Sequence, residues 1–171
     1  MVRKNRQTET RMVAEYAASE YKDFTYMLAV PLGRIPDNVI KDVGYTQAIA
    51  FMRPYRLEVD AIVVLPRYLV LIEAKVFKTI DGLAKLPLYK SLVPFTPELA
   101  QYADREVIME LVVGWTNPNL EIMARDAGVR LKVYAPDWLA AVVQEYHQYW
   151  TKEYRDQRNQ KLALRTMYGI D

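Results

Sequence analysis

The sequence predicts a single α/β domain in which helices flank a central mixed β-sheet. Two adjacent apolar runs, 56–65 and 68–77, predict an antiparallel hairpin that turns at Pro66-Arg67. The apolar run 106–115 predicts a buried central strand. Helical patterns stand before the hairpin, between it and the central strand, and after that strand. Because strands joined through helices tend to run parallel, a three-layer arrangement around a mixed sheet follows.

The individual elements follow from apolar spacing and turn residues. Apolar residues recur at helical intervals over 7–24, and residues 25–30 predict a short strand that Pro31 and Gly33 end. Segment 45–53 is compatible with a strand or a helix, and we favour a strand. After the hairpin we expect a helix over 81–91 that contains Pro87, a helical turn capped by Thr96, and the strand 106–115. A helix from Asn117-Pro118 to Gly128 and a strand over 129–134 should follow. Asp137 then caps a last helix that runs to about residue 150.

Composition and charge are those of an ordinary globular protein. The chain has 171 residues, of which 51% are apolar and 26% charged, so it can bury a core without covalent staples. The absence of Cys excludes disulfides and zinc–thiolate sites. No apolar run approaches the roughly 20 residues of a membrane span, and the N-terminus lacks the apolar core of a signal peptide. We therefore expect no membrane association and a cytoplasmic location, or a virus-encoded protein that acts in the host cytoplasm.

The net charge of +2 is unevenly distributed. Residues 1–11 carry four basic side chains and one acidic one, and residues 151–171 carry five basic and three acidic ones. Such basic ends can contact phosphates, but solvated termini that happen to be basic are an equally good interpretation.

Three charged side chains interrupt the apolar hairpin. Glu73 and Lys75 are two residues apart and must project from the same face, and the turn at Pro66-Arg67 places Asp60 opposite Glu73. Carboxylate oxygens are the ligands that Mg²⁺ or Mn²⁺ prefers, and an adjacent lysine can orient a water molecule for attack on phosphorus. A purely structural pairing of Lys75 with the two acids is the alternative. Because buried pairs rarely add stability, the pattern favours a metal site for phosphodiester hydrolysis.

Asp60 followed by Glu73-Ala74-Lys75 resembles the D…ExK signature of the PD-(D/E)xK nuclease superfamily. Val59 stands where the family name has proline, a departure that many members share. The segment GWTNPNLEIMARDAGVRLKVYAPDWL (114–139) looks like the later helix and strand of the Mrr-like and resolvase-like members. The resemblance covers roughly residues 9–139. It implies a restriction-endonuclease-like three-layer α/β/α fold with a nuclease-like domain over 1–150, followed by a polar C-terminal tail of helical character over 151–171.

The resemblance also implies roles for single residues. Asp60 and Glu73 would bind the metal ion, and Lys75 would position the attacking water. Many members place a further metal-supporting glutamate on the first helix. TETRMVAEY (8–16) is similar to the first-helix pattern of archaeal Holliday-junction resolvases, which makes Glu9 the first choice and Glu20 the second.

A helix after the motif offers candidates for substrate binding. Lys85 and Tyr89 have the spacing of the Q-x-x-x-Y helix of RecB-like members, with Lys where Gln would stand. Lys85 either meets a phosphate or is a plain surface lysine. The lone His147, which lies among aromatic residues, is expected to serve packing or surface rather than catalysis.

Two functions of different classes follow. The resemblance implies a Mg²⁺- or Mn²⁺-dependent deoxyribonuclease with DNA as its partner, and a homodimer is an option because family members often cut both strands as dimers. The alternative is a non-catalytic structural or assembly protein of a phage or mobile element that reuses the fold. Compact size and modest charge favour the alternative, whereas an intact D…ExK triad favours the enzyme. A stand-alone nucleic-acid-binding module lacks support in zinc spacing, aromatic strand motifs or a basic stripe.

Overall fold

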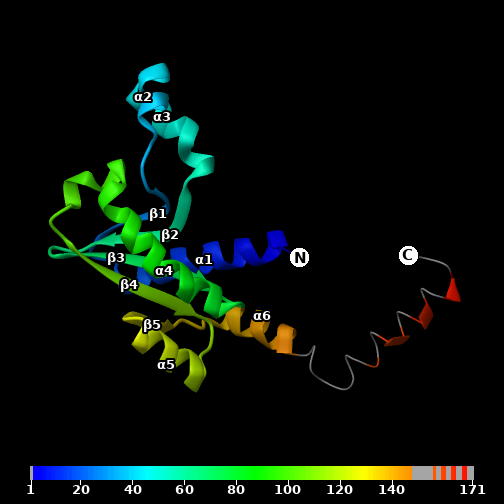
Figure 1. The fold of residues 1–171 in the computed structure, drawn as a ribbon. Helices are drawn as coiled ribbons and strands as arrows, with labels where there is room; N and C mark the ends of the chain where they lie inside the picture. Colours follow the sequence, from blue (N-terminus) through cyan, green and yellow to red (C-terminus); the bar gives the residue numbers. More distant parts are fainter. Residues whose placement is uncertain (1, 148–155, 157–158, 161–162, 165–166, 169–171) are drawn as a thin grey trace. The chain divides into compact units, whose positions relative to one another are not determined.

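The computed structural model describes residues 2–147, together with 156, 159–160, 163–164 and 167–168 (Figure 1). The chain divides into two compact units, Met1–Tyr134 and Ala135–Asp171. The second unit contains helix α6 (Asp137–His147) and short helical pieces within the predicted tail. The predicted domain boundary at residue 150 lies outside the described residues, as does the side chain of His147. No helix in the described part combines the length and apolarity that crossing a membrane requires.

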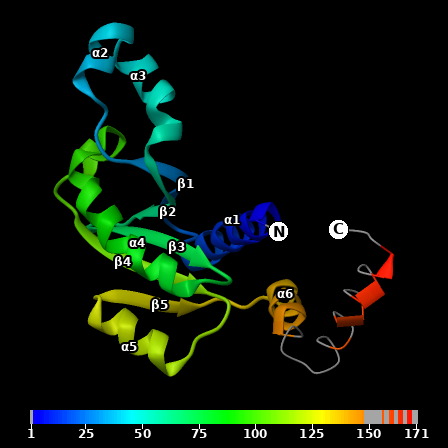
Figure 2. The ribbon, with the colours of Figure 1, turned by 45° about the vertical axis from the view of Figure 1, so that its right-hand side comes forward.

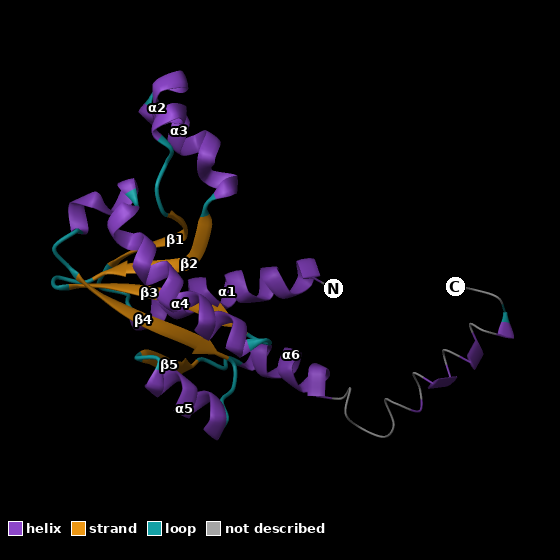
Figure 3. Cartoon of the chain, in the orientation of Figure 1, coloured by secondary structure: helices purple, strands orange, loops and turns teal. Residues whose placement is uncertain are grey.

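The described part of the first unit contains a five-stranded sheet with the order β1-β2-β3-β4-β5 (Figure 3). The first three strands pair antiparallel, and the last three pair parallel. This arrangement confirms the predicted α/β class with a mixed sheet. The strands are β1 (Thr25–Leu32), β2 (Leu57–Val64), β3 (Tyr68–Lys75), β4 (Glu106–Val113) and β5 (Val129–Val133).

Helices cover both faces of the sheet, as a three-layer arrangement requires (Figures 1 and 2). The neighbouring residues Glu110 and Leu111 of β4 point to opposite faces. Glu110 meets Tyr16 on one face, and Leu111 lies close to Gly82 on the other. The helices on the sheet are α1 (Val2–Glu20) over β2 and β3, α4 (Thr79–Leu92) over β3 and β4 on the opposite face, and α5 (Pro118–Asp126) beside β5.

The hairpin has the predicted register. Ala61 pairs with Ile72 and Val64 pairs with Leu69. The Leu65 N–H donates to the carbonyl of Tyr68 at 2.9 Å and closes the turn. All residues of β3 between its two ends are buried, which gives its polar members a rigid frame.

The segment between β1 and β2 corrects the sequence analysis, because the strand predicted over 45–53 is wrong. The segment forms helices α2 (Asp37–Val43) and α3 (Tyr45–Met52), then a 3₁₀ turn over Arg53–Tyr55. Ala48 and Ala50 favour a helix, and the sheet of the described residues has no strand beside this segment with which an extended conformation could pair. We call residues 34–56 the arm, and Figures 1 and 2 show its helices projecting away from the sheet.

Two predicted helix caps have different outcomes. Asn117 caps α5, since its side chain accepts the Leu120 N–H at 3.0 Å. Thr96 makes no such bond to the 3₁₀ helix η3 (Pro97–Tyr102) that follows it. Its hydroxyl instead accepts the Gly33 N–H and donates to the Leu92 carbonyl, both at 2.9 Å. Thr96 therefore ties the end of β1 to the end of α4.

Candidate metal and phosphodiester site

The predicted acids and lysine gather where β3 ends and β2 begins. Glu73 lies two residues before the end of β3, and its side chain is 1% exposed. Lys75 ends the same strand, and its side chain is 12% exposed. Its Nζ atom lies 3.0 Å from Oε1 of Glu73. Because the two side chains share a face of β3, this contact follows from strand geometry alone.

Glu9 reaches the same place from α1. Its Oε2 atom lies 3.3 Å from Nζ of Lys75, and its Oε1 atom accepts the Val76 N–H at 3.4 Å. Glu20 lies exposed at the C-terminal end of α1, eleven residues after Glu9 and therefore roughly 16 Å further along the helix axis. The structure thus brings the first-choice glutamate to the site and leaves the second choice away from it.

Asp60 completes the cluster from β2. Its Oδ2 atom accepts the backbone N–H of Ala74 at 2.8 Å, so the carboxylate is fixed beside the end of β3. The β1–β2 ladder pairs the residues on either side of Ala29 and Asp60 but not these two themselves. Ala29 has a φ of 52°, a conformation that non-glycine residues rarely adopt, and its carbonyl accepts from Arg53 at 3.0 Å. Backbone strain therefore lies opposite Asp60, as it often does at functional sites.

One carboxylate oxygen of Glu73 lacks a hydrogen-bond partner among the described residues. Oε1 receives two ammonium groups, Lys75 at 3.0 Å and Lys85 at 3.4 Å. Oε2 is buried and receives none. Leaving a buried charged acceptor unsatisfied costs about 1–3 kcal/mol or more. Oε2 of Glu73 is consequently the oxygen of the cluster that is most available to bind an additional cation.

Burial and mutual charge shift the pKa values of the cluster. Burial raises the pKa of Glu73, and the charge of Asp60 raises it further, although Lys75 opposes both. Burial likewise raises the pKa of Glu9 against the influence of Lys75. Burial alone would lower the pKa of Lys75, but the surrounding carboxylates outweigh it and raise that pKa. Lys75 therefore stays an ammonium group at neutral pH.

Helix α4 lies directly over the cluster. Lys85 touches Glu73 while its side chain remains 47% exposed, so it is neither a deeply buried partner nor an isolated surface lysine. Tyr89, one turn further on, is buried, and burial together with the charges of Glu73 and Asp60 raises its pKa. Both residues predicted for substrate binding thus border the site, with only Lys85 offering an exposed donor.

Gly82 is a site-lining residue that the sequence analysis missed. A Cβ atom at this position would lie 2.7 Å from Cγ of Lys75 and 2.9 Å from Cδ1 of Leu111. Only glycine permits so close an approach of α4 to β3. The available signal was a glycine inside an otherwise helical pattern, which often marks such an approach.

Ion pairs and a backbone hydrogen bond connect the charged groups of the cluster. Among the described residues, no group of three or more His, Cys, Asp or Glu side chains is arranged to hold a metal ion. The ammonium of Lys75 contacts both Glu9 and Glu73, and Asp60 is engaged by a backbone N–H. The donor set nevertheless fits Mg²⁺ or Mn²⁺, since it consists of carboxylate oxygens, including the unpartnered one of Glu73.

A second buried acid, Glu110 on β4, was also missed. It is fully buried on the α1 face, and its Oε1 atom accepts the hydroxyls of Tyr16 at 2.9 Å and Tyr21 at 3.0 Å. Burial raises its pKa, and the two tyrosines, with the more distant charges of Lys132 and Arg130, counteract this in part. Its place in the middle of an apolar run was a usable signal, because buried acids need partners.

Replacement of Glu110 by Gln is expected to stabilise the fold increasingly as the pH rises. An acid whose folded-state pKa is raised contributes its full stability below the ordinary pKa of 4.5 and loses it as the pH climbs towards the folded-state value. Each pKa unit of elevation corresponds to about 1.4 kcal/mol. Urea unfolding of both proteins between acidic and neutral pH measures the difference, with the exposed Glu106→Gln on the same strand as the control. A constant difference between Glu110→Gln and the wild type would contradict this account.

Comparison with known proteins identifies no family. No protein-family model matches this chain, and no curated protein matches it. Among solved structures, the crystal structure of a repair endonuclease from Pyrococcus abyssi is similar, with a TM-score of 0.46 and 13% sequence identity. The matched region covers 74% of this chain and 46% of that chain, so this chain spans less than half the length of that endonuclease.

Proposed function

We propose that this chain is a divalent-metal-dependent nuclease that hydrolyses phosphodiester bonds in DNA. The observation that carries the proposal is the convergence of Glu9, Asp60 and Glu73 around Lys75, from three different elements. Contacts between residues so far apart in the chain require the fold, and one buried oxygen of Glu73 has no hydrogen-bond partner in the described residues. A cluster built only for stability would gain little from this arrangement.

Each residue has a role in such a reaction. Asp60 and Glu73 would hold Mg²⁺ or Mn²⁺, and Glu9 would balance Lys75 from α1. The ion supplies Lewis-acid polarisation of a phosphate oxygen when it is bound. Lys75 donates hydrogen bonds that orient the attacking water and stabilise charge on the phosphate oxygens. The oxygen of the attacking water would form the new bond to phosphorus and lose a proton to the solvent, the ester P–O bond would break, and the departing oxygen would take up a proton from the solvent.

A thermal-unfolding titration with Mg²⁺ or Mn²⁺ tests the metal site. A ligand at about 100 times its Kd stabilises the folded state by about 2.7 kcal/mol, which raises the Tm of a domain of this size by several degrees. Asp60→Asn should abolish the increase, whereas Asp104→Asn, an exposed aspartate in the turn before β4, should keep it. Equal increases in all three proteins would place metal binding elsewhere.

A non-catalytic role in structure or assembly remains the second candidate, and one observation favours it. Lys75 pairs with Glu9 and Glu73 and so balances part of the negative charge of the cluster internally, and no three-acid group is arranged for a metal in the described residues. This function predicts no metal-dependent increase in Tm. A non-catalytic role does not explain why a buried oxygen of Glu73 has no hydrogen-bond partner among the described residues.

A further inference from the structure

The arm has almost no core of its own. Helix α2 has no buried residue, and α3 buries only Ala48. Helices of seven and eight residues are marginal in isolation, so their stability depends on contacts. The arm instead exposes large apolar side chains, which mark interaction surfaces when they gather in one region. These are Val43 at 40%, Tyr45 at 50%, Phe51 at 61% and Tyr55 at 74% exposure.

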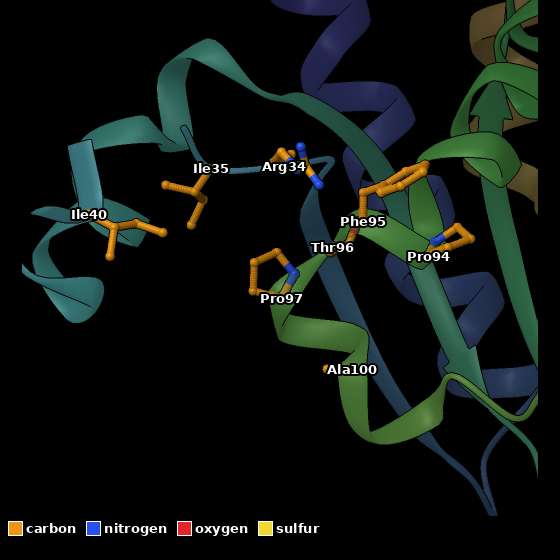
Figure 4. A pocket seen from close by; sticks show the side chains of 8 residues that line it. All are labelled: Arg34, Ile35, Ile40, Pro94, Phe95, Thr96, Pro97 and Ala100. Carbon is orange, nitrogen blue, oxygen red and sulfur yellow. The ribbon is translucent and has the colours of Figure 1, made fainter. Parts of the chain in front are cut away.

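The body of the unit covers the base of the arm, where Ile35 is buried, but leaves most apolar side chains of α2 and α3 at least partly exposed. A hollow of about 280 Å³ separates the arm from the segment 94–100 (Figure 4). Ile35 and Ile40 line it from the arm, and Pro97 lines it from the opposite side. The connection to the body is made at the base, where Arg56 bonds to the Pro31 carbonyl and pairs with Glu98. The exposed apolar surface of the arm is therefore available to a partner.

The arm leaves the sheet at the end that holds the proposed active site. It connects the last residue of β1 with the first residue of β2, Leu57. Asp60 follows three residues later, roughly 10 Å along the strand. Arg53 of the arm also donates to the carbonyl of Ala29, directly across from Asp60. A molecule that touches the base of the arm is thus within reach of the metal site.

Charge at this end of the molecule favours a polyanion. Residues 34–56 contain four basic and two acidic side chains. The arm therefore carries +2, which equals the net charge of the whole chain, so the rest of the chain is neutral on balance. A second copy of this chain would bring like charges together, whereas a nucleic acid would find complementary ones.

We propose that the arm binds unpaired bases of a nucleic acid substrate by stacking, an inference that rests on the proposed nuclease function and specifies its substrate. Phe51 and Tyr55 lie one helical turn apart, with ring centroids 6.2 Å apart and planes inclined by 39°. Arg53 lies between them in the sequence; it pairs with Glu58 at 3.8 Å, and its side chain is still 56% exposed. Exposed aromatic rings next to cations bind single strands with little sequence preference. The substrate class is DNA with a single-stranded segment beside the bond that is cut.

Fluorescence anisotropy of a labelled single-stranded oligonucleotide, with EDTA present to prevent cutting, tests the proposal. The double variant Phe51→Ala/Tyr55→Ala should raise the Kd about tenfold or more, and binding of the same-sequence duplex should change less. Phe24→Ala is the matched control, because Phe24 is 43% exposed at the opposite end of β1. Phe51→Trp should retain binding, since a larger ring still stacks. Thermal unfolding checks that each variant is folded. If the double variant is unfolded, Tyr55→Ala alone replaces it, with a smaller expected increase in the Kd for the single strand.

The outcomes separate this proposal from the nuclease assignment. Asp60→Asn should lose DNA cutting but keep the binding of single strands that depends on the arm. If the wild-type protein binds single strands through the arm but never cuts DNA, only the nuclease assignment is contradicted. Unchanged single-strand binding in the arm variant overturns the stacking proposal even if wild-type protein cuts DNA. Light scattering measures whether the wild type is a dimer and the arm variant a monomer. That result, together with unchanged single-strand binding, would also overturn the stacking proposal and would identify the arm as a contact between two copies of the chain.

Discussion

Replacement of Lys75 by Met is expected to lower DNA cutting by about 10²- to 10⁴-fold, the usual contribution of a side chain that orients or protonates a reacting group. The same change should strengthen the response to metal. In the folded chain the Lys75 ammonium contacts Glu9 and Glu73, and Glu73 is also a proposed ligand of the metal ion. Without the ammonium of Lys75, Glu9 loses its cation and Glu73 keeps only that of Lys85, so a divalent ion is better able to compensate the remaining negative charge.

Two measurements check this prediction together. Cutting rates at saturating Mg²⁺ should fall, and the Mg²⁺-dependent rise in Tm should exceed that of the wild type. Lys90→Met, which removes an exposed lysine from the last turn of α4, is the control and should change neither. If Lys75→Met cuts DNA at the wild-type rate, Lys75 has no role in the reaction.

Gly82→Ala is expected to reduce cutting by about 100-fold with a much smaller effect on stability, because a displacement of 1 Å at an active site has consequences of this size. The added Cβ would lie 2.7 Å from Cγ of Lys75 and 3.3 Å from Cγ of Glu73, so both side chains must move. Alanine favours the helix by about 1 kcal/mol, which offsets part of the roughly 1–3 kcal/mol that overpacking costs.

The control for Gly82→Ala is the reverse change two residues away. Ala84→Gly, at an exposed position of α4, should lower the free energy of unfolding by about 1 kcal/mol and leave cutting unchanged. Urea unfolding and a cutting assay on both variants separate helix propensity from displacement of the site. Full activity in Gly82→Ala would show that the positions of Lys75 and Glu73 under α4 do not matter for the reaction.

The hairpin could be predicted from local information alone. The turn at Pro66-Arg67 fixes the register, and alternation along a strand then places Asp60, Glu73 and Lys75 together. The helix before the hairpin and the helices and strands after it also followed from periodicity and capping residues. The fold class and the positions of the three motif residues can therefore be predicted from the sequence of short segments.

The remaining features depend on tertiary contacts that local patterns do not encode. Segment 45–53 has apolar residues that suit a strand, but in the part of the chain that the structure describes no strand lies beside it, so the helix propensity of its alanines determines its conformation. Glu110 finds its hydroxyl partners Tyr16 and Tyr21 far away in the sequence. The contact of Gly82 with β3 likewise exists only once α4 has packed on the sheet.

Incubation of the wild type and Asp60→Asn with plasmid, linear duplex, single-stranded and four-way-junction DNA, in Mg²⁺ and in Mn²⁺, tests the proposed activity most directly. The proposed site predicts that the wild type cuts at least one of these DNAs, that EDTA stops it, and that Asp60→Asn does not cut while retaining its fold. Intact DNA in every wild-type reaction, or equal cutting by Asp60→Asn, would contradict the assignment of this cluster as a nuclease site.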